Sequence, residues 1–256
     1  MVRSSKNLRI GVDVGGSAIK CALVDIDSGA RLERRTVPTP AQGAPEALLD
    51  AIAAATEGLP AGIAVGLAFP SVIVRGVVRT AAHLNHAWIG RALDQLAAAR
   101  LGRSVTAIND ADAAGLAEQR FGAAQGVTGT VLLLTLGTGI GSALFTRGVL
   151  VPNTELGHLR VGDSEAEERA APRIKVERNL SWEAWTSELN RVLDTMHALL
   201  WPDLIVLCGG ITEDSDAFLA GLRCEAQIRI GTLRAEAGVV GAALATLFDA
   251  DHRQHP

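Results

Sequence analysis

Ile10-Gly11-Val12-Asp13-Val14-Gly15-Gly16-Ser17-Ala18-Ile19-Lys20 predicts a strand, a glycine turn and a second strand. An acidic side chain within a strand of Val and Ile is costly to bury unless it is paired or faces a ligand. The two glycines of the turn permit positive φ and leave backbone N–H groups uncovered, an arrangement suited to phosphate oxygens. Ser17 would add a hydroxyl and Lys20 a positive charge. The alternative interpretation is an ordinary tight hairpin in which Asp13 stabilises the turn.

The same pattern returns in the second half of the chain. Leu134-Thr135-Leu136-Gly137-Thr138-Gly139-Ile140-Gly141-Ser142 again places a glycine turn after an apolar strand. It is not a Walker motif, because no Gly-Lys-Ser/Thr follows, and a strand rather than the helix of a dinucleotide-binding turn is expected after it. The two matched turns, with Gly209-Gly210 after a third apolar run, indicate two related halves. They also predict a cleft that holds a phosphate chain from both sides.

Short β-branched runs alternate with longer segments rich in Ala and Leu, which is typical of α/β proteins. We expect an N-terminal α/β lobe over residues 1–112 and a C-terminal α/β lobe over residues 113–256, whose last helix is able to pack back on the first lobe. Further strands are expected at residues 62–68, 105–108, 130–136, 142–145 and 204–207, and helices at residues 45–56, 91–99, 111–121, 182–200 and 239–248. Ser181 is the expected N-cap of the fourth helix, whose apolar stripe belongs to the core.

Asn109-Asp110-Ala111-Asp112 stands where a strand meets a helix. One interpretation is structural: Asp110 caps the helix, and Asp112 favours its positive end. The other places Asp110 at the carboxyl end of a strand, where open α/β sheets form their ligand crevice. A carboxylate there can accept a proton from a hydroxyl that attacks phosphorus. The two interpretations are compatible.

A loop punctuated by Pro and Gly carries Asn153-Thr154-Glu155-Leu156-Gly157-His158. Glu155 and His158, with Asn153 nearby, offer acceptors and donors for several hydroxyls of one polyol. An isolated Glu or His in a surface loop would have no such role. No Cys or carboxylate close to His158 in the sequence points to a metal.

Four basic residues stand close together in an otherwise acidic protein: Arg169, Arg173, Lys175 and Arg178. Near-neighbour pairing with Glu165, Glu167, Glu168 and Glu177 would make this an ordinary solvated segment. The alternative is a local track for a long phosphate chain. Pro172 interrupts any continuous helix here.

Composition excludes several classes of protein. The 256 residues are 48% hydrophobic and carry a net charge of -4, which excludes disorder and a broad basic footprint for nucleic acid. Cys21, Cys208 and Cys224 are too far apart for a disulfide framework or a structural zinc site. No apolar run approaches the roughly 18 residues of a membrane span, and Asp13 interrupts the first one. We therefore expect a cytoplasmic protein that binds neither nucleic acid nor a membrane.

Four motifs occur in one order along the chain: Asp13 to Lys20, Asn109 to Ala114, Leu134 to Ser142 and Pro152 to His158. Together they closely resemble the ROK-family sugar kinases, specifically their polyphosphate glucokinase branch. The likeness extends from about Leu8 to Leu247. It implies the two-lobed actin-like ATPase fold, related to ribonuclease H, usually assembled as a homodimer. It also implies transfer of a terminal phosphoryl group from polyphosphate, with ATP as a further donor to be tested, to the 6-hydroxyl of glucose.

The resemblance assigns roles to individual residues. Asp110 would be the general base, and Asp13 would help to position Mg²⁺ through water. The hexose would be held by Asn109, Glu155 and His158. The phosphates would be held by Gly15, Gly16, Ser17, Lys20, Gly137, Thr138 and Gly139.

The chain also departs from the family pattern. Most ROK members have a Cys/His zinc motif after the loop of His158, but residues 159–180 contain no Cys, so we expect no zinc. In the polyphosphate branch we expect Asn and Asp where this chain has His83 and Asn85, which leaves the hexose preference and the dimer contact open. Pro172 stands within the basic segment that would handle polyphosphate.

Three other functions are considered. A strictly ATP-dependent glucokinase or glucomannokinase would share the same motifs. A sugar-sensing ROK regulator needs a DNA-binding segment, and about seven residues before the first strand are too few for a helix-turn-helix. A catalytically dead nucleotide-binding scaffold is disfavoured, because Asp110, Glu155 and His158 are all present.

Overall fold

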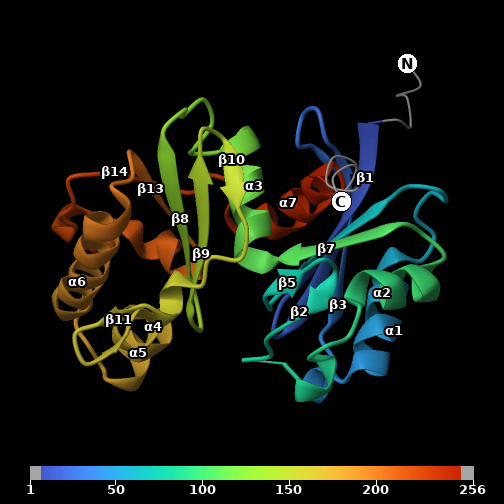
Figure 1. The fold of residues 1–256 in the computed structure, drawn as a ribbon, viewed down its shortest axis with the longest axis horizontal. Helices are drawn as coiled ribbons and strands as arrows, with labels where there is room; N and C mark the ends of the chain where they lie inside the picture. Colours follow the sequence, from blue (N-terminus) through green and yellow to red (C-terminus); the bar gives the residue numbers. More distant parts are fainter. Residues whose placement is uncertain (1–6, 83, 249–256) are drawn as a thin grey trace. The chain divides into compact units, whose positions relative to one another are not determined.

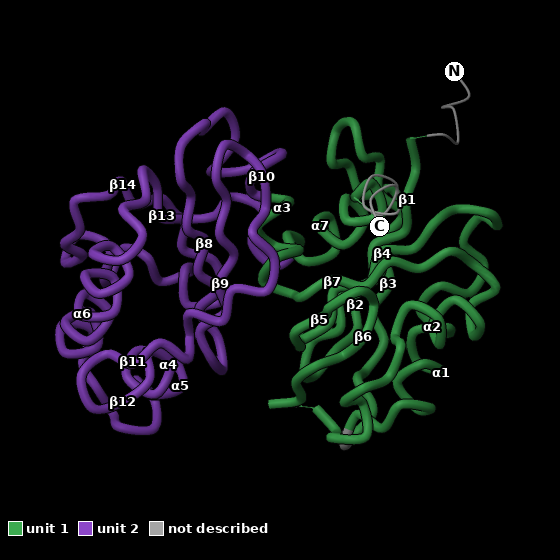
Figure 2. Tube along the Cα trace, viewed as in Figure 1, with its two compact units in different colours: residues 1–117, 236–256 green, residues 118–235 purple. Residues whose placement is uncertain are grey.

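The computed structural model describes residues 7–82 and 84–248 (Figure 1). The chain divides into two compact units (Figure 2): unit 1 takes the chain up to Ala117 and again from Glu236, and unit 2 is Glu118–Ala235. The border lies within helix α3 (Asp110–Phe121), later than the expected end of the first lobe at residue 112. The last helix belongs to unit 1.

Unit 1 is built on a five-stranded sheet with the order β3-β2-β1-β4-β7. The first three strands form an antiparallel meander: β1 (Leu8–Val14), β2 (Ala18–Asp25) and β3 (Arg31–Pro38). The next two run parallel to β1: β4 (Val65–Phe69) and β7 (Val105–Asn109). The strands expected on both sides of the Gly15 turn are confirmed.

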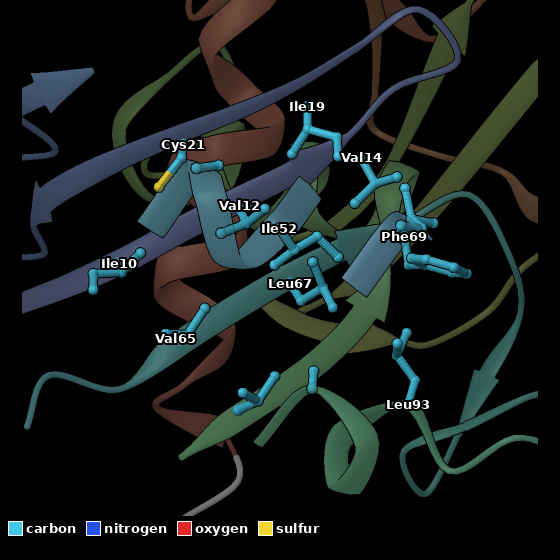
Figure 3. Close-up of a cluster of buried hydrophobic side chains, with 14 of the residues drawn as sticks. Ile10, Val12, Val14, Ile19, Cys21, Ile52, Val65, Leu67, Phe69 and Leu93 are labelled. Carbon is cyan, nitrogen blue, oxygen red and sulfur yellow. The ribbon is translucent and has the colours of Figure 1, made fainter. Parts of the chain in front are cut away.

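Helices α1 (Pro45–Thr56) and α2 (Leu93–Leu101) cover one face of this sheet. Successive side chains of a strand point to opposite faces. Ile10, Val12 and Val14 of β1 therefore point together into the core formed with the two helices, and all three are buried. Figure 3 shows Val12 close to Ile52 of α1 and Leu67 of β4. This apolar face accounts for the β-branched character of the first strand.

Helix α7 (Ala237–Ala245) packs on β1 and β4 at a distance that only glycine permits. A Cβ on Gly11 would lie 1.9 Å from a backbone oxygen of α7, and a Cβ on Gly66 would lie 1.6 Å from another. Gly241 of α7 approaches the carbonyl oxygen of Ala113 in α3 equally closely, at 1.6 Å from its added Cβ. Glycine at these positions lets the backbones of β1, β4 and α3 each come into contact with that of α7.

Unit 2 contains a second five-stranded sheet with the order β10-β9-β8-β13-β14. Its meander is β8 (Thr130–Leu136), β9 (Ile140–Thr146) and β10 (Val149–Val151), and its parallel strands are β13 (Leu204–Cys208) and β14 (Gln227–Ile230). Strand order, strand direction and the glycine turn between the first two strands all repeat those of unit 1. The shared topology agrees with the two related halves that the matched glycine turns predict.

Helix α6 (Trp182–Leu200) forms much of the core of unit 2. The Ser181 hydroxyl accepts the N–H of Ala184 at 3.2 Å, which confirms the expected N-cap. Trp185 is fully buried, and its indole N–H donates to the carbonyl oxygen of Ala170 at 3.0 Å. The apolar stripe of this helix is core, as expected.

Pro172 separates two short helices, α4 (Ala166–Ala170) and α5 (Pro172–Glu177). Ala171 between them has an extended backbone, and Pro172 occupies the first turn of α5, where its missing N–H costs no hydrogen bond. The remaining short strands are β5 (Ile73–Val74), β6 (Val77–Val78), β11 (Arg160–Val161) and β12 (Ser164–Glu165).

Candidate functional site

Thr39 holds the first glycine turn, which joins β1 to β2. Its hydroxyl donates to the carbonyl oxygen of Gly15 at 2.6 Å, and its N–H donates to that of Ser17 at 3.1 Å. Within residues 7–82 and 84–248, the N–H groups of Gly16 and Ser17 have no hydrogen-bond partner. Neither Gly15 nor Gly16 has a positive φ, so the turn does not use the conformational freedom that its glycines permit. The turn nevertheless offers two uncovered donors to an anion.

Asp13 and Lys20 lie directly opposite each other in the β1–β2 pair. Burial raises the pKa of Asp13, and the positive charge of Lys20 opposes that rise. An added Cβ on Gly238 would lie 2.7 Å from the Asp13 carboxylate, so the start of α7 encloses this group. A bound cation would offset the cost of a poorly solvated carboxylate, and carboxylate oxygen is a ligand that Mg²⁺ prefers. Asp13 therefore fits the expected role beside Mg²⁺.

Asn109 is the N-cap of α3 and fixes the backbone around Asp110. Its Oδ1 accepts the N–H groups of Ala111 at 2.9 Å and Asp112 at 3.0 Å, while its Nδ2 donates to the carbonyl oxygen of Ser71 at 3.2 Å. Asn109 is therefore the N-cap residue, the position that the structural interpretation gave to Asp110. Asp110 is half-buried at the first position of α3, and its carboxylate accepts the N–H of Ala111 at 2.8 Å. The capping bonds leave Asn109 one amide hydrogen for any ligand.

The second glycine turn, in unit 2, joins β8 to β9. Gly137 donates its N–H to the carbonyl oxygen of Gly139 at 3.0 Å, while the N–H groups of Thr138 and Gly139 have no partner in the described part of the chain. The carboxylate of Glu167 accepts the N–H of Ile140 at 3.4 Å, and a Cβ on Gly139 would lie 2.4 Å from it. Neither Gly137 nor Gly139 has a positive φ, and the atom nearest to an added Cβ on Gly139 is the end of the flexible Glu167 side chain. The carboxylate of Glu167 therefore lies beside the second glycine turn, whereas the basic Lys20 follows the first glycine turn.

Two contacts attach the loop of Glu155 and His158 to the start of β9. The Ser142 hydroxyl accepts the N–H of Leu156 at 3.0 Å and donates to a carbonyl oxygen of the loop. An added Cβ on Gly157 would lie 2.0 Å from the carbonyl oxygen of the first residue of β9. This loop therefore lies against the strand that follows the second glycine turn.

Three carboxylates surround His158. Its Nδ1 lies 2.7 Å from an oxygen of Glu165, and its Nε2 lies 3.9 Å from an oxygen of Glu155. His158, Glu165 and Glu167 hold three possible metal-ligand atoms within 4.8 Å of one another. Residues close to His158 in the sequence do not point to a metal, but the fold brings Glu165 and Glu167, seven and nine positions further along the chain, beside its ring.

Both expected hexose ligands in this loop have a raised pKa. Burial raises the pKa of Glu155, and the charge of Glu167 adds to the effect. The hydrogen bond to Glu165 raises the pKa of His158 against the opposing effect of burial. The sequence pattern gave no sign of this cluster, since Glu165 and Glu167 look like counter-charges of the basic segment.

The four basic residues all have partners in unit 2. Arg169 donates to Asp163 and Glu188, both at 2.6 Å. Arg173 lies 3.8 Å from Glu177, Lys175 lies 4.2 Å from the ring centre of Trp182, and Arg178 donates to the carbonyl oxygen of Glu168 at 3.2 Å. The pairing of Arg173 with Glu177 agrees with the interpretation as a solvated segment, while Arg169 is enclosed by partners outside that set.

Two further residues named from the sequence have different outcomes. His83 lies outside the described residues. The Asn85 side chain accepts the N–H of Ala87 at 2.9 Å and starts the turn that buries Trp88.

None of the helices in the described segments is both long and apolar enough to span a membrane.

Comparisons with known proteins give consistent results. A model of the ROK family matches residues 9–171. The polyphosphate glucokinase of Mycobacterium tuberculosis is 43% identical over 244 residues, which cover 94% of this chain and 92% of that protein. The crystal structure of the inorganic polyphosphate/ATP-glucomannokinase from Arthrobacter sp. strain KM is 44% identical with a TM-score of 0.91, covering 95% of this chain and 100% of that one. A ROK family glucokinase from Streptomyces griseus, in complex with glucose and AMPPNP, is 25% identical with a TM-score of 0.79, covering 92% and 98%.

Proposed function

The chain belongs to the ROK family, and from that premise we propose that Asp110 is the general base of a glucokinase whose phosphoryl donor is inorganic polyphosphate. The chain is a hexose kinase with the two-lobed actin-like ATPase fold of its relatives. The observation that carries this conclusion is the identity of 43% to a polyphosphate glucokinase over nearly the whole of both chains. This chain carries all three residues proposed for the base and the hexose site, Asp110, Glu155 and His158.

Asp110 is proposed to accept the proton of the 6-hydroxyl of glucose as that oxygen attacks the terminal phosphorus. A primary alcohol is a poor nucleophile, and a positioned base contributes about 10²–10⁴-fold to such a step. The cap formed by Asn109 holds the backbone of this base in place. Glu155 and His158 are proposed to bind hexose hydroxyls, together with the remaining amide hydrogen of Asn109. A hexose that lacks a matching hydroxyl would leave these polar groups unpaired, which gives selectivity.

The donor phosphates are proposed to bind uncovered backbone N–H groups in the two glycine turns. The proposed residues are Gly15, Gly16, Ser17 and Lys20 in the first turn and Gly137, Thr138 and Gly139 in the second. Mg²⁺ beside Asp13, held through water, would neutralise charge on the transferred phosphoryl group. Arg173, Lys175 and Arg178 are proposed as the track of a longer polyphosphate, whereas the partners of Arg169 in unit 2 make it the weakest member of that set.

Asp110→Asn tests the assignment of the base. We expect kcat to fall by about 10²–10⁴-fold while glucose binding, measured by calorimetry, is retained. Asp50→Asn is the matched control, because Asp50 is an exposed carboxylate of α1 that pairs with Arg100 at 2.8 Å. Normal turnover of Asp110→Asn would show that another group takes the proton.

Initial rates with glucose and mannose, each crossed with polyphosphate and ATP, test the donor. The Arthrobacter protein is called a polyphosphate/ATP-glucomannokinase, which favours ATP as a second donor and mannose as a second acceptor for this chain. Turnover with ATP alone would leave the hexose kinase in place and reject polyphosphate. Replacing Arg173, Lys175 and Arg178 together by Gln should raise KM for polyphosphate more than KM for ATP.

We further propose that the protein is a cytoplasmic homodimer and that it uses Mg²⁺. We propose that it binds neither nucleic acid nor a membrane. Sedimentation of the purified chain tests the dimer. The absence of zinc remains a prediction, because His158, Glu165 and Glu167 could also hold a metal. Elemental analysis after dialysis against a chelator tests it.

A further inference from the structure

The hydrogen bond between His158 and Glu165 is a contact that the proposed function does not yet use. Nδ1 of the imidazole lies 2.7 Å from Oε2 of Glu165, whereas Nε2 lies 3.9 Å from Oε2 of Glu155. The first distance is that of a short, charge-assisted hydrogen bond, and the second is too long for a hydrogen bond. One ring nitrogen is thus held by the protein, and the other remains able to engage a ligand.

Glu165 is itself held firmly by local structure. It is the second residue of β12, paired with Arg160 of β11, and it is the N-cap of α4. Glu165 and Glu168 form a capping box, in which the N–H of Glu165 donates to the Glu168 carboxylate at 3.2 Å. The backbone that carries the acceptor is therefore fixed on both sides before any ligand arrives.

A carboxylate acceptor at Nδ1 determines the protonation of the whole ring. Nδ1 carries the hydrogen in the neutral ring as well as in the cation, so the tautomer protonated only on Nε2 is disfavoured. In the cation, Nε2 also carries a hydrogen and donates. A sugar hydroxyl can accept from that Nε2 and donate to the nearby Glu155 carboxylate.

We propose that Glu165 is a positioning residue of the hexose site: it holds Nδ1–H of His158 and thereby presents Nε2 to a sugar hydroxyl. This inference rests on the proposed function, which assigns the hexose to Glu155 and His158. Glu165 acts only through His158 and touches neither sugar nor phosphate.

The charges around the ring give this arrangement a defined pH dependence. Glu165, Glu167 and Glu155 all favour the imidazolium, and the hydrogen bond to Glu165 is the largest cause of the raised pKa of His158. Nε2 consequently keeps its hydrogen to a higher pH than it would in an ordinary histidine. Replacing Glu165 by Gln lowers that pKa, so the donor is lost earlier as the pH rises.

Long-range ¹H–¹⁵N correlation spectra of the histidine rings test the contact without any need for activity. The chain has six histidines, and loss of one signal set in His158→Gln assigns the ring of His158. We expect a ring protonated at Nδ1 throughout the titration, with a pKa that falls in Glu165→Gln. A ring protonated at Nε2 alone, or an unchanged pKa in Glu165→Gln, would overturn the proposal. So would one equivalent of metal that survives dialysis against EDTA and disappears in Glu165→Gln.

Kinetics test the consequence for the sugar. At pH 7.5 we expect Glu165→Gln to raise KM for glucose by about fivefold to tenfold, the size of one well-placed hydrogen bond, with little change in kcat. In Glu165→Gln, KM for glucose should begin to rise at a lower pH than in the parent. Glu165→Asp, which keeps a carboxylate, should restore part of the lost affinity for glucose. Glu168→Gln is the matched control, because it weakens the same capping box without touching His158. An equal rise in KM for Glu168→Gln would overturn the positioning role.

The two experiments separate the two claims. A chain that does not phosphorylate glucose but shows the expected ring would reject the proposed function alone. A chain that phosphorylates glucose with an unchanged KM in Glu165→Gln would reject the positioning role alone.

Discussion

His158 shows how one hydrogen bond links stability to pH. Its pKa in the folded chain is raised, chiefly by Glu165, above the value of about 6.5 that is expected after unfolding. A group of this kind stabilises the fold fully below the unfolded pKa and loses that contribution as the pH rises through the folded pKa. Because the pair is partly exposed, solvent limits the contribution to about 1 kcal/mol or less.

Urea unfolding from pH 5.5 to 9 measures this contribution. We expect the parent to have a larger free energy of unfolding than Glu165→Gln. This difference should be largest near pH 5.5 and should shrink as the pH rises through the folded pKa of His158. The opposite trend, a difference that grows with pH, would contradict the assigned cause of the raised pKa.

Residue patterns predicted some residues of the candidate site, but not the residues that surround them in the fold. Glu155 and His158 could be singled out because both lie in one short loop with polar character. Glu165 and Glu167 could not, since only the pairing of β11 with β12 brings them beside the ring. For Asn109, the sequence showed a polar residue at a strand end but not that its Oδ1 is used by α3.

Helix α7 shows the energetic consequence of close packing between elements. Gly66 of β4 has no space for a side chain, because its Cβ would lie 1.6 Å from a backbone oxygen of the helix. A backbone oxygen within a helix cannot rotate away, so the strand and helix must separate. Overpacking of a buried site typically costs about 1–3 kcal/mol, and this rigid contact belongs at or above the upper end of that range.

Gly66→Ala should therefore lower the free energy of unfolding by about 3 kcal/mol or more in urea titrations. Gly210→Ala is the matched control: its φ is not positive, and its Cβ would meet no atom within 4 Å. That variant should stay within about 0.5 kcal/mol of the parent. Equal stability of the two variants would show that α7 moves freely on the sheet.

In the two five-stranded sheets, the strands that the sequence did not predict all lie at the edges. They are β3, β10 and β14. An edge strand needs no apolar alternation on its open side and is often protected by charge. In β3, Arg31, Glu33 and Arg34 interrupt the kind of apolar run that identified β1 and β8. The inner strands could be predicted because burial on both faces demands continuous apolar runs.

The two units have the same topology, but unit 1 is not continuous in the sequence. Helix α7, which packs on the five-stranded sheet of unit 1, follows all of unit 2 in the sequence. The sequence predicted the duplicated glycine turns because each turn is local. The boundary within α3 depends on packing between residues far apart in the chain, which local patterns do not record. The sequence left room for the last helix to pack back on the first lobe, and that helix belongs to unit 1.

Ending the chain at Ala235 tests this arrangement. Removal of α7 uncovers Gly11, Gly66 and the apolar face around them, and it removes buried side chains such as Val239, Val240 and Leu244. Burial of each Val or Leu contributes about 1.5–3 kcal/mol, so the loss is comparable to the 5–15 kcal/mol that stabilises a whole domain. Hydrogen exchange should show peptides of β1 and β4 unprotected, while those of β8 and β13 remain protected in the same sample. Full protection of β1 in the shortened chain would mean that unit 1 is complete without its last helix.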